Sequence, residues 1–192
     1  MMLRILTVAA VLAAAPAFAS VAPSTTTIYD ATGGSENGGD SFATGGHILV
    51  DEVRNVSAAT LYSVTLNVRA AKPDLGSFEV VLTPVSAKGT PLGLKAVVIA
   101  TVADKTLTNN FGLITVTPSA PVSLLANRLY YVGIRRVIGA RNSVVLGNTV
   151  DPTVLSRASV VAGGNYYNSG GVQANSGGPY EIKVETVVSA GN

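Results

Sequence analysis

Regular alternation of apolar and polar residues is the feature of this sequence that most restricts its fold. From residue 62 onward, the even positions are apolar and the odd positions are polar. The apolar set is Tyr62, Val64, Leu66, Val68 and Ala70, and the polar set is Ser63, Thr65, Asn67 and Arg69. A period of two is typical of a β-strand with one buried face and one wet face. The pattern therefore predicts half-buried strands rather than amphipathic helices.

The same alternation recurs along the chain. Tyr180, Ile182 and Val184 alternate with charged residues, and Phe78, Val80 and Leu82 share one face of an earlier run. Gly, Pro, Asn and Asp separate the runs, as turns require. About eight to ten strands at this spacing predict an all-β fold, an antiparallel β-sandwich of the jelly-roll or immunoglobulin-like sort. The further β-rich runs are His47–Val53, Ala96–Val102, Leu113–Thr117, Leu129–Val137, Val144–Val150 and Leu155–Val161.

The N-terminus has the pattern of a secretory signal. An apolar run from Ile5 to Ala15 follows Arg4 and leads to the small residues around Phe18. Cleavage is expected after Ala19. We therefore expect a signal helix at 1–19 and a single β-sandwich domain at 20–192, with no integral membrane segment after cleavage. The expected location is secreted, extracellular, or periplasmic and cell-surface associated.

Composition excludes several functions. The chain has no cysteine, which rules out disulfides, thiol catalysis and cysteine-bound metals. Charged residues make up only 12% of the sequence, against roughly 25% in an average soluble domain. The net charge of +2 gives no argument for binding nucleic acid.

Six short motifs follow one another along the chain: Ser41–Thr44, Leu61–Leu66, Gly76–Leu82, Leu124–Val132, Asn165–Gly171 and Pro179–Val184. Their order resembles the choice-of-anchor group of bacterial secreted proteins. This resemblance implies a β-sandwich fold and export, and it implies no catalytic residues. Members often carry a C-terminal sorting anchor, and none is expected here after Val188.

Catalytic chemistry has little support. His47 is the sole histidine, so any Ser-His-Asp arrangement or histidine metal site depends on it. The eleven acids fall mostly on predicted loops or wet strand faces, and no Trp is present to stack on a sugar. A hydrolase is therefore the third alternative, behind two non-enzymatic functions.

Calcium is the one possible cofactor. Asp30, Glu36, Asn37 and Asp40 offer oxygen ligands within a glycine-rich stretch that begins at Tyr29. Their spacing matches neither the EF-hand loop nor the nonapeptide calcium repeat. The alternative is a solvated loop whose glycines serve turns, and we favour this alternative.

Two further groups are candidates for binding. Asn165, Tyr166, Tyr167 and Asn168 lie between glycine pairs, where exposed rings could contact a glycan or a partner. Acidic residues gather before residue 53, whereas arginines gather between Arg128 and Arg157. These two sets could neutralise each other, or the arginine set could hold an anion or a partner copy. The arginine candidates are Arg135, Arg136 and Arg141.

The leading hypothesis is an exported, non-enzymatic protein of the bacterial envelope or extracellular matrix. It would act through surface interactions or self-association, with extracellular polysaccharide or another copy of the chain as partner. The alternative is a carbohydrate-binding or calcium-binding jelly-roll module.

Overall fold

The computed structural model describes residues 23–33, 36–41, 48–70, 76–85, 96–137, 144–149, 165–168, 171–174 and 178–188. The side chains of residues 36, 37, 165–168 and 171–174 lie outside this description. Two antiparallel sheets pack face to face, so the predicted antiparallel β-sandwich is confirmed. No helix in the described ranges is long and apolar enough to cross a membrane. The predicted signal at 1–19 lies outside the described residues.

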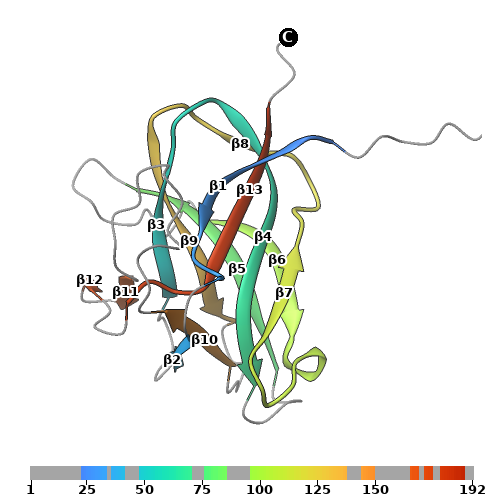
Figure 1. Ribbon diagram of the computed structural model, residues 1–192, viewed down its shortest axis with the longest axis vertical. Coiled ribbons are helices and arrows are strands. Elements are labelled where there is room, and N and C mark those ends of the chain that lie inside the picture. Colours follow the sequence, from blue (N-terminus) through green and yellow to red (C-terminus); the bar gives the residue numbers. More distant parts are fainter. Residues whose placement is uncertain are drawn as a thin grey trace, which may run out of the picture.

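The first sheet has seven strands in the order β1-β13-β4-β10-β2, and β7 and β8 also pair with β4. Figure 1 shows β1, β13 and β4 running close together through the middle of the molecule. The bounds are β1 Thr25–Asp30, β2 Glu36–Ser41, β4 Ala59–Ala70, β7 Gly112–Val116, β8 Val122–Leu124, β10 Val144–Thr149 and β13 Ile182–Val188.

The second sheet has six strands in the order β12-β11-β3-β9-β5-β6. A 3-10 turn, η2 at Asp104–Thr106, follows β6 on the way to β7 in the first sheet. The bounds are β3 Ile48–Asn55, β5 Ser77–Pro84, β6 Val97–Ala103, β9 Arg128–Arg136, β11 Asn165–Asn168 and β12 Gly171–Ala174.

Strand β4 is long enough to hold four partners. Along one edge it pairs first with β13, through Ile182, and then with β10, through Leu146. Along the other edge it pairs with β7 and β8. Where β13 gives way to β10, the Glu181 amide donates to the Gly147 carbonyl at 2.8 Å. This junction brings residues distant in sequence onto one sheet face.

The core lies between the sheets and has the predicted alternation. Phe78, Val80 and Leu82 are buried together with Tyr180, Ile182 and Val184. Burial of apolar side chains is the main favourable contribution to folding, at roughly 25 cal/mol per Å². The alternating runs of the sequence therefore supply the inner faces of both sheets.

The predicted inward position of Tyr62 is wrong. Its side chain is 36% exposed, whereas Leu61 is buried in the core. The register shifts between Glu185 and Thr186, which pair with Ser63 and Leu61, so Tyr62 is the extra residue of a bulge. A bulge reverses the facing of the residues on one side of it. The even-numbered pattern therefore holds from Val64 onward and fails before it.

Three strands lie where turns or loops were expected. The stretch that holds the calcium candidates contains the end of β1 and all of β2 except Ser41, and Tyr166 and Tyr167 belong to β11. Glycine and Asn are depleted in strands, so their composition indicated loops. In β2, however, a Cβ on Gly39 would lie 2.4 Å from the carbonyl oxygen of Leu146. Close approach of β2 and β10 thus requires glycine inside a strand.

Tyr130 and Tyr131 lie on opposite faces of β9, as predicted. Tyr130 is part of the core between the sheets. Tyr131 belongs to a second buried cluster on the other face of the six-stranded sheet. Burial, and then the charge and hydrogen bond of Glu52, raise the pKa of Tyr131 to about 12. The other members of this cluster are Ile48, Val50, Val81 and Val85, with Leu129 packed against them.

Candidate functional site

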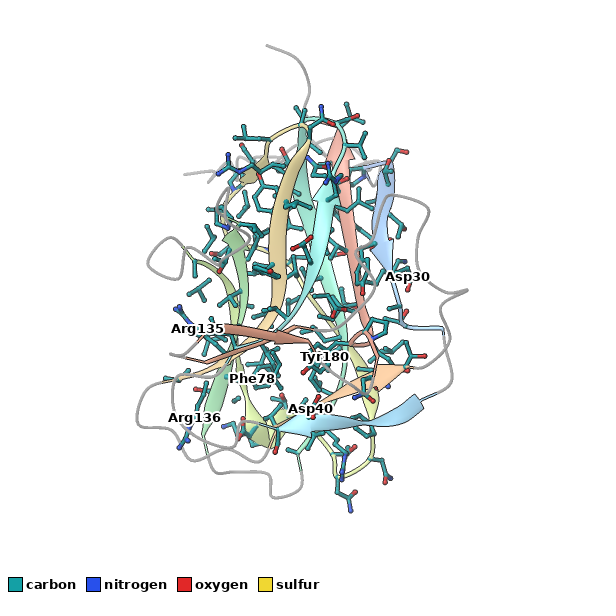
Figure 2. The ribbon with its side chains drawn as sticks, turned by 90° about the vertical axis from the view of Figure 1, so that its left-hand side faces the viewer. Asp30, Asp40, Phe78, Arg135, Arg136 and Tyr180 are labelled. Atoms are coloured by element: carbon teal, nitrogen blue, oxygen red, sulfur yellow. The ribbon has the colours of Figure 1, made fainter. Side chains whose placement is uncertain are left out.

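A buried tyrosine and aspartate network joins the two sheets. The Tyr29 hydroxyl donates to Oδ2 of Asp51 at 2.5 Å, and the Tyr180 amide donates to Oδ1 of Asp51 at 3.1 Å. The Tyr180 hydroxyl donates to Asp40 at 3.0 Å. Figure 2 shows Tyr180 inside the molecule, above Asp40. Four separate segments of the chain thus meet through side-chain hydrogen bonds.

This network is closed to ligands. Asp51 is 1% exposed, and the rings of Tyr29 and Tyr180 are fully buried. Burial raises the pKa of Asp51 to about 7, although both hydrogen bonds to the carboxylate act in the opposite direction. Burial, and then the charge of Asp51, also raise the pKa of Tyr29. A satisfied polar group in a dry core fixes how its neighbours pack. We therefore assign the network to structure rather than to binding.

A second polar cluster lies on the outer face of the seven-stranded sheet, at the junction of β4, β10 and β13. The Asn67 side-chain amide donates to Oε2 of Glu181. A Cβ on Gly147 would lie 2.9 Å from that same oxygen and 3.3 Å from the Phe111 ring. Glycine at 147 therefore leaves the space that the carboxylate and the ring occupy.

Arg69 completes this cluster. Its guanidinium lies 5.0 Å from the centroid of the Phe111 ring, within the range of a cation–π contact. Within the described residues, Nε of Arg69 is buried and has no hydrogen-bond partner. A guanidinium has five donors in a fixed fork and favours carboxylates and other oxygen acceptors. Because Nε itself is buried, a ligand oxygen could accept a hydrogen bond only from the exposed part of this partly buried side chain.

The same face continues toward β1 as a row of paired polar side chains. Glu185 accepts from Ser63 at 2.9 Å and forms an ion pair with Lys183 at 2.9 Å. The hydrogen bond from Lys183 lowers the pKa of Glu185, and the same bond raises the pKa of Lys183. The hydroxyls of Thr65 and Thr115 lie 2.9 Å apart. We call this surface the polar face: Tyr62, Ser63, Thr65, Asn67, Arg69, Phe111, Thr115, Glu181, Lys183 and Glu185.

The polar face has the chemistry of a recognition surface. Hydroxyl, amide and carboxylate groups hydrogen-bond one another across neighbouring strands, and the Arg69 guanidinium lies against the Phe111 ring. Tyr62 adds a partly exposed ring beside them, and Phe111 adds a second ring. In ligand-binding sites, aromatic rings commonly supply apolar contact area, and a few fixed polar groups set the orientation of the ligand.

The predicted arginine patch is in part paired. Arg135 donates to Glu79, its cross-strand neighbour on β5, at 2.5 Å. The partner of Arg135 is therefore Glu79, and not one of the acidic residues before residue 53. Figure 2 shows Arg135 and Arg136 on the opposite side of the molecule from Asp30. Arg141 lies outside the described residues, so the three-arginine site stays a prediction.

The predicted calcium ligands are only partly described. Oδ1 of Asp30 accepts from both the amide and the hydroxyl of Thr32, at 2.9 and 2.7 Å. Asp40 accepts from Tyr180 and lies well apart from Asp30 in Figure 2. Among the described residues no group of three Asp, Glu, His or Cys side chains forms a metal site. The side chains of Glu36 and Asn37 lie outside the description, so the calcium site remains a prediction.

The tyrosine candidates lie in β11, which pairs with β3 and β12. Tyr166 is opposite Leu49 and Tyr167 is opposite Ile48. The side chains of Asn165, Tyr166, Tyr167 and Asn168 lie outside the description, and His47 lies outside it altogether. Their proposed binding roles stay predictions.

Sequence reasoning missed the buried acids. Asp51 and Glu52 were counted with an acidic set that either neutralises the arginines or faces water, and Glu181 was read as a wet-face residue, yet all three are buried. One signal was present, because two adjacent acids inside an apolar strand must occupy opposite faces. Asp51 therefore had to point toward one layer and Glu52 toward the other. Their partners come from distant strands and leave no local signal.

Comparisons with known proteins support the fold. No family model matches the sequence, and no curated protein matches it significantly. Among solved structures, the chain is similar to the cysteine protease and lectin-like domains of Cwp84, a surface layer associated protein of Clostridium difficile. The TM-score is 0.50 at 17% sequence identity. The match covers 74% of this chain and 32% of that one, so the chain corresponds to about a third of the length of Cwp84 in that structure.

Proposed function

We propose that this chain is a non-enzymatic binding module of the bacterial cell surface, and that it recognises extracellular polysaccharide through the polar face. The single observation that carries this proposal is the cluster of Asn67, Arg69 and Phe111, three partly exposed side chains in which the guanidinium lies 5.0 Å from the ring centroid and the amide is held by the buried Glu181 carboxylate.

The chemistry of this cluster suits a saccharide. Sugar hydroxyls both donate and accept, so the partly exposed amide of Asn67 and guanidinium of Arg69 can each bond one of them. The neighbouring groups are already ordered by mutual hydrogen bonds, which reduces the entropy lost on binding. Tyr62 and Phe111 offer rings against the apolar faces of sugars.

Two further observations support the proposal. The N-terminal pattern is that of a secretory signal, which is consistent with action outside the cell. The structurally similar protein is described as surface layer associated and includes a lectin-like domain. The resemblance to the choice-of-anchor group points to the same location.

A glycan panel followed by calorimetry tests this proposal. We expect Arg69→Ala to weaken binding of the best polysaccharide by about tenfold or more, since it removes a charge-assisted contact. Arg128→Ala is the matched control, because Arg128 is an exposed arginine on the other sheet. Equal affinity of the Arg69→Ala variant contradicts the site. Absence of binding to every glycan contradicts the proposed ligand class.

The non-enzymatic part of the proposal has its own test. Prolonged incubation with the bound polysaccharide should release no new reducing ends. Release of reducing ends at a rate proportional to protein concentration supports the hydrolase alternative instead.

A further inference from the structure

Strand β6 ends the six-stranded sheet and pairs only with β5 in the described part of the chain. An edge strand has a row of backbone N–H and C=O groups directed away from its sheet. Along this edge, the Ala103 carbonyl accepts from the Thr106 hydroxyl at 2.7 Å. No other hydrogen bond to the outward edge of β6 occurs among the described residues. Among the described residues, the edge of β6 is therefore available for pairing with another strand.

The sequence around β6 has little of the usual protection against pairing. Between Ala96 and Asn127 the only charged residues are Asp104 and Lys105, and Asp104 is fully buried. Val97 and Val98 are 38% and 40% exposed. Natural edge strands are commonly protected by charges, proline or bulges. Here the protection is a single bulge at Ile99, where the register with β5 shifts.

The same side of the sandwich also exposes β7. The turn η2 and a short connection join β6 to β7, and apolar residues of both strands pack against the same core cluster. Leu113 on β7 is 60% exposed. Val102, Ile114, Val116 and Val122 pack against the core but are only partly buried. This side therefore combines two strand edges with an incompletely covered apolar seam.

We propose that the β6 edge is a homodimer interface, in which β6 pairs antiparallel with β6 of a second copy about a two-fold axis. Such a contact sets each strand against its own sequence, so any charge on the edge faces a like charge. Strand β6 has no charged residue, and it is the longest edge strand among those described. The β1 edge includes Asp30, and the β2 edge includes Glu36 and Asp40, whereas β7, β8 and β12 are also uncharged but shorter than β6.

A second copy is thus the partner whose charge pattern fits. The two six-stranded sheets become one continuous sheet, and the exposed valines of both copies come together. This inference is independent of the polysaccharide proposal, because the polar face lies on the outer face of the other sheet. A monomeric protein that binds glycan contradicts only the dimer proposal. A dimer that binds no glycan contradicts only the polysaccharide proposal.

Sedimentation velocity over a range of concentrations, at low and high salt, tests the interface. The wild-type protein should show a reversible monomer–dimer equilibrium that high salt does not weaken, since the edge is uncharged. The double variant Val98→Lys/Thr101→Lys sets lysines of the two copies against each other. Its dissociation constant should rise by about tenfold or more.

The matched control is Val56→Lys/Leu125→Lys, which adds the same charge at two exposed positions outside β6 and should leave the dissociation constant unchanged. Hydrogen exchange of the wild-type protein gives a second readout that needs no variant. Amides of β6 should gain protection as concentration rises. A protein that is monomeric at every concentration overturns the proposal. A dimer that dissociates in high salt but persists in the Val98→Lys/Thr101→Lys variant also overturns it.

Discussion

The hydroxyl of Tyr29 donates to the carboxylate of Asp51 across the interior of the sandwich, from β1 in one sheet to β3 in the other. Both side chains are buried, and Asp51 also accepts from the Tyr180 amide. The hydrogen bond from Tyr29 links the two sheets through Asp51. An apolar residue at position 51 would leave the Tyr180 amide without this partner.

Replacing Tyr29 by Phe should destabilise the fold. The substitution removes one donor from a buried carboxylate, which costs about 1–3 kcal/mol in free energy of unfolding. Urea denaturation monitored by circular dichroism measures the change. Tyr62→Phe is the control, because that ring is partly exposed and lies on the outer face. If Tyr29→Phe and the control have equal unfolding free energies, the hydrogen bond between Tyr29 and Asp51 does not stabilise the fold.

Stability should fall as pH rises through the range in which Asp51 ionises. Because the pKa of folded Asp51 is raised to about 7, the native state binds more protons than the unfolded state between about pH 4 and pH 7. Unfolding free energy therefore decreases over that window, by at most about 4 kcal/mol for a shift of this size.

The pH effect is isolated by comparing the wild type with Asp51→Asn. Other groups contribute in both proteins, and Glu185, whose pKa is lowered, loses its contribution as pH falls. The difference in unfolding free energy between the two proteins should change with pH only between about pH 4 and pH 7. A constant difference across that window shows that Asp51 does not titrate there.

Alanine at Gly147 should disturb the polar face. Its Cβ would lie 2.9 Å from the Glu181 carboxylate, so the carboxylate or the Phe111 ring must move. We expect a loss of about 1–3 kcal/mol in stability together with weaker glycan binding. Gly112→Ala on β7 is the matched control, since a Cβ there meets no atom within 4 Å. Equal stability of the two variants contradicts the assigned packing.

Glu79→Gln should release Arg135 from its ion pair. The pair is partly exposed, so the loss of stability should not exceed about 1 kcal/mol. Retention on a sulfated polysaccharide column should increase, and added salt should weaken it. The double variant Glu79→Gln/Arg135→Gln should return retention to the wild-type level or below. If retention stays high in the double variant, Arg135 is not the responsible cation.

Calcium should leave the melting temperature unchanged. We expect this because Asp30 and Asp40 each accept hydrogen bonds from other side chains and lie apart from each other. Thermal melts with calcium and with chelator measure this directly. A calcium-dependent rise in melting temperature that Asp30→Asn and Asp40→Asn both abolish establishes the calcium site predicted from the sequence.

Local pattern was sufficient for the regular strands and insufficient at irregular ones. Alternation predicted the inward faces of β5 and β13, because each side chain direction follows from its neighbours in the strand. The bulge at Tyr62 broke this rule, since the extra residue is defined only by pairing with β13. Strand β2 was missed because its glycines serve the approach of β10, which is a contact between distant segments.

The amino-acid sequence by itself determined the class of fold, since a period of two and turn residues at short spacing allow stacked antiparallel sheets and little else. It also determined the low surface charge and the absence of cysteine chemistry. Only the tertiary structure decided which polar residues are buried and which remain accessible. Asp51, Glu181 and Arg69 acquire their roles from strands far away in sequence, because strand pairing order and register are long-range properties that no local pattern encodes.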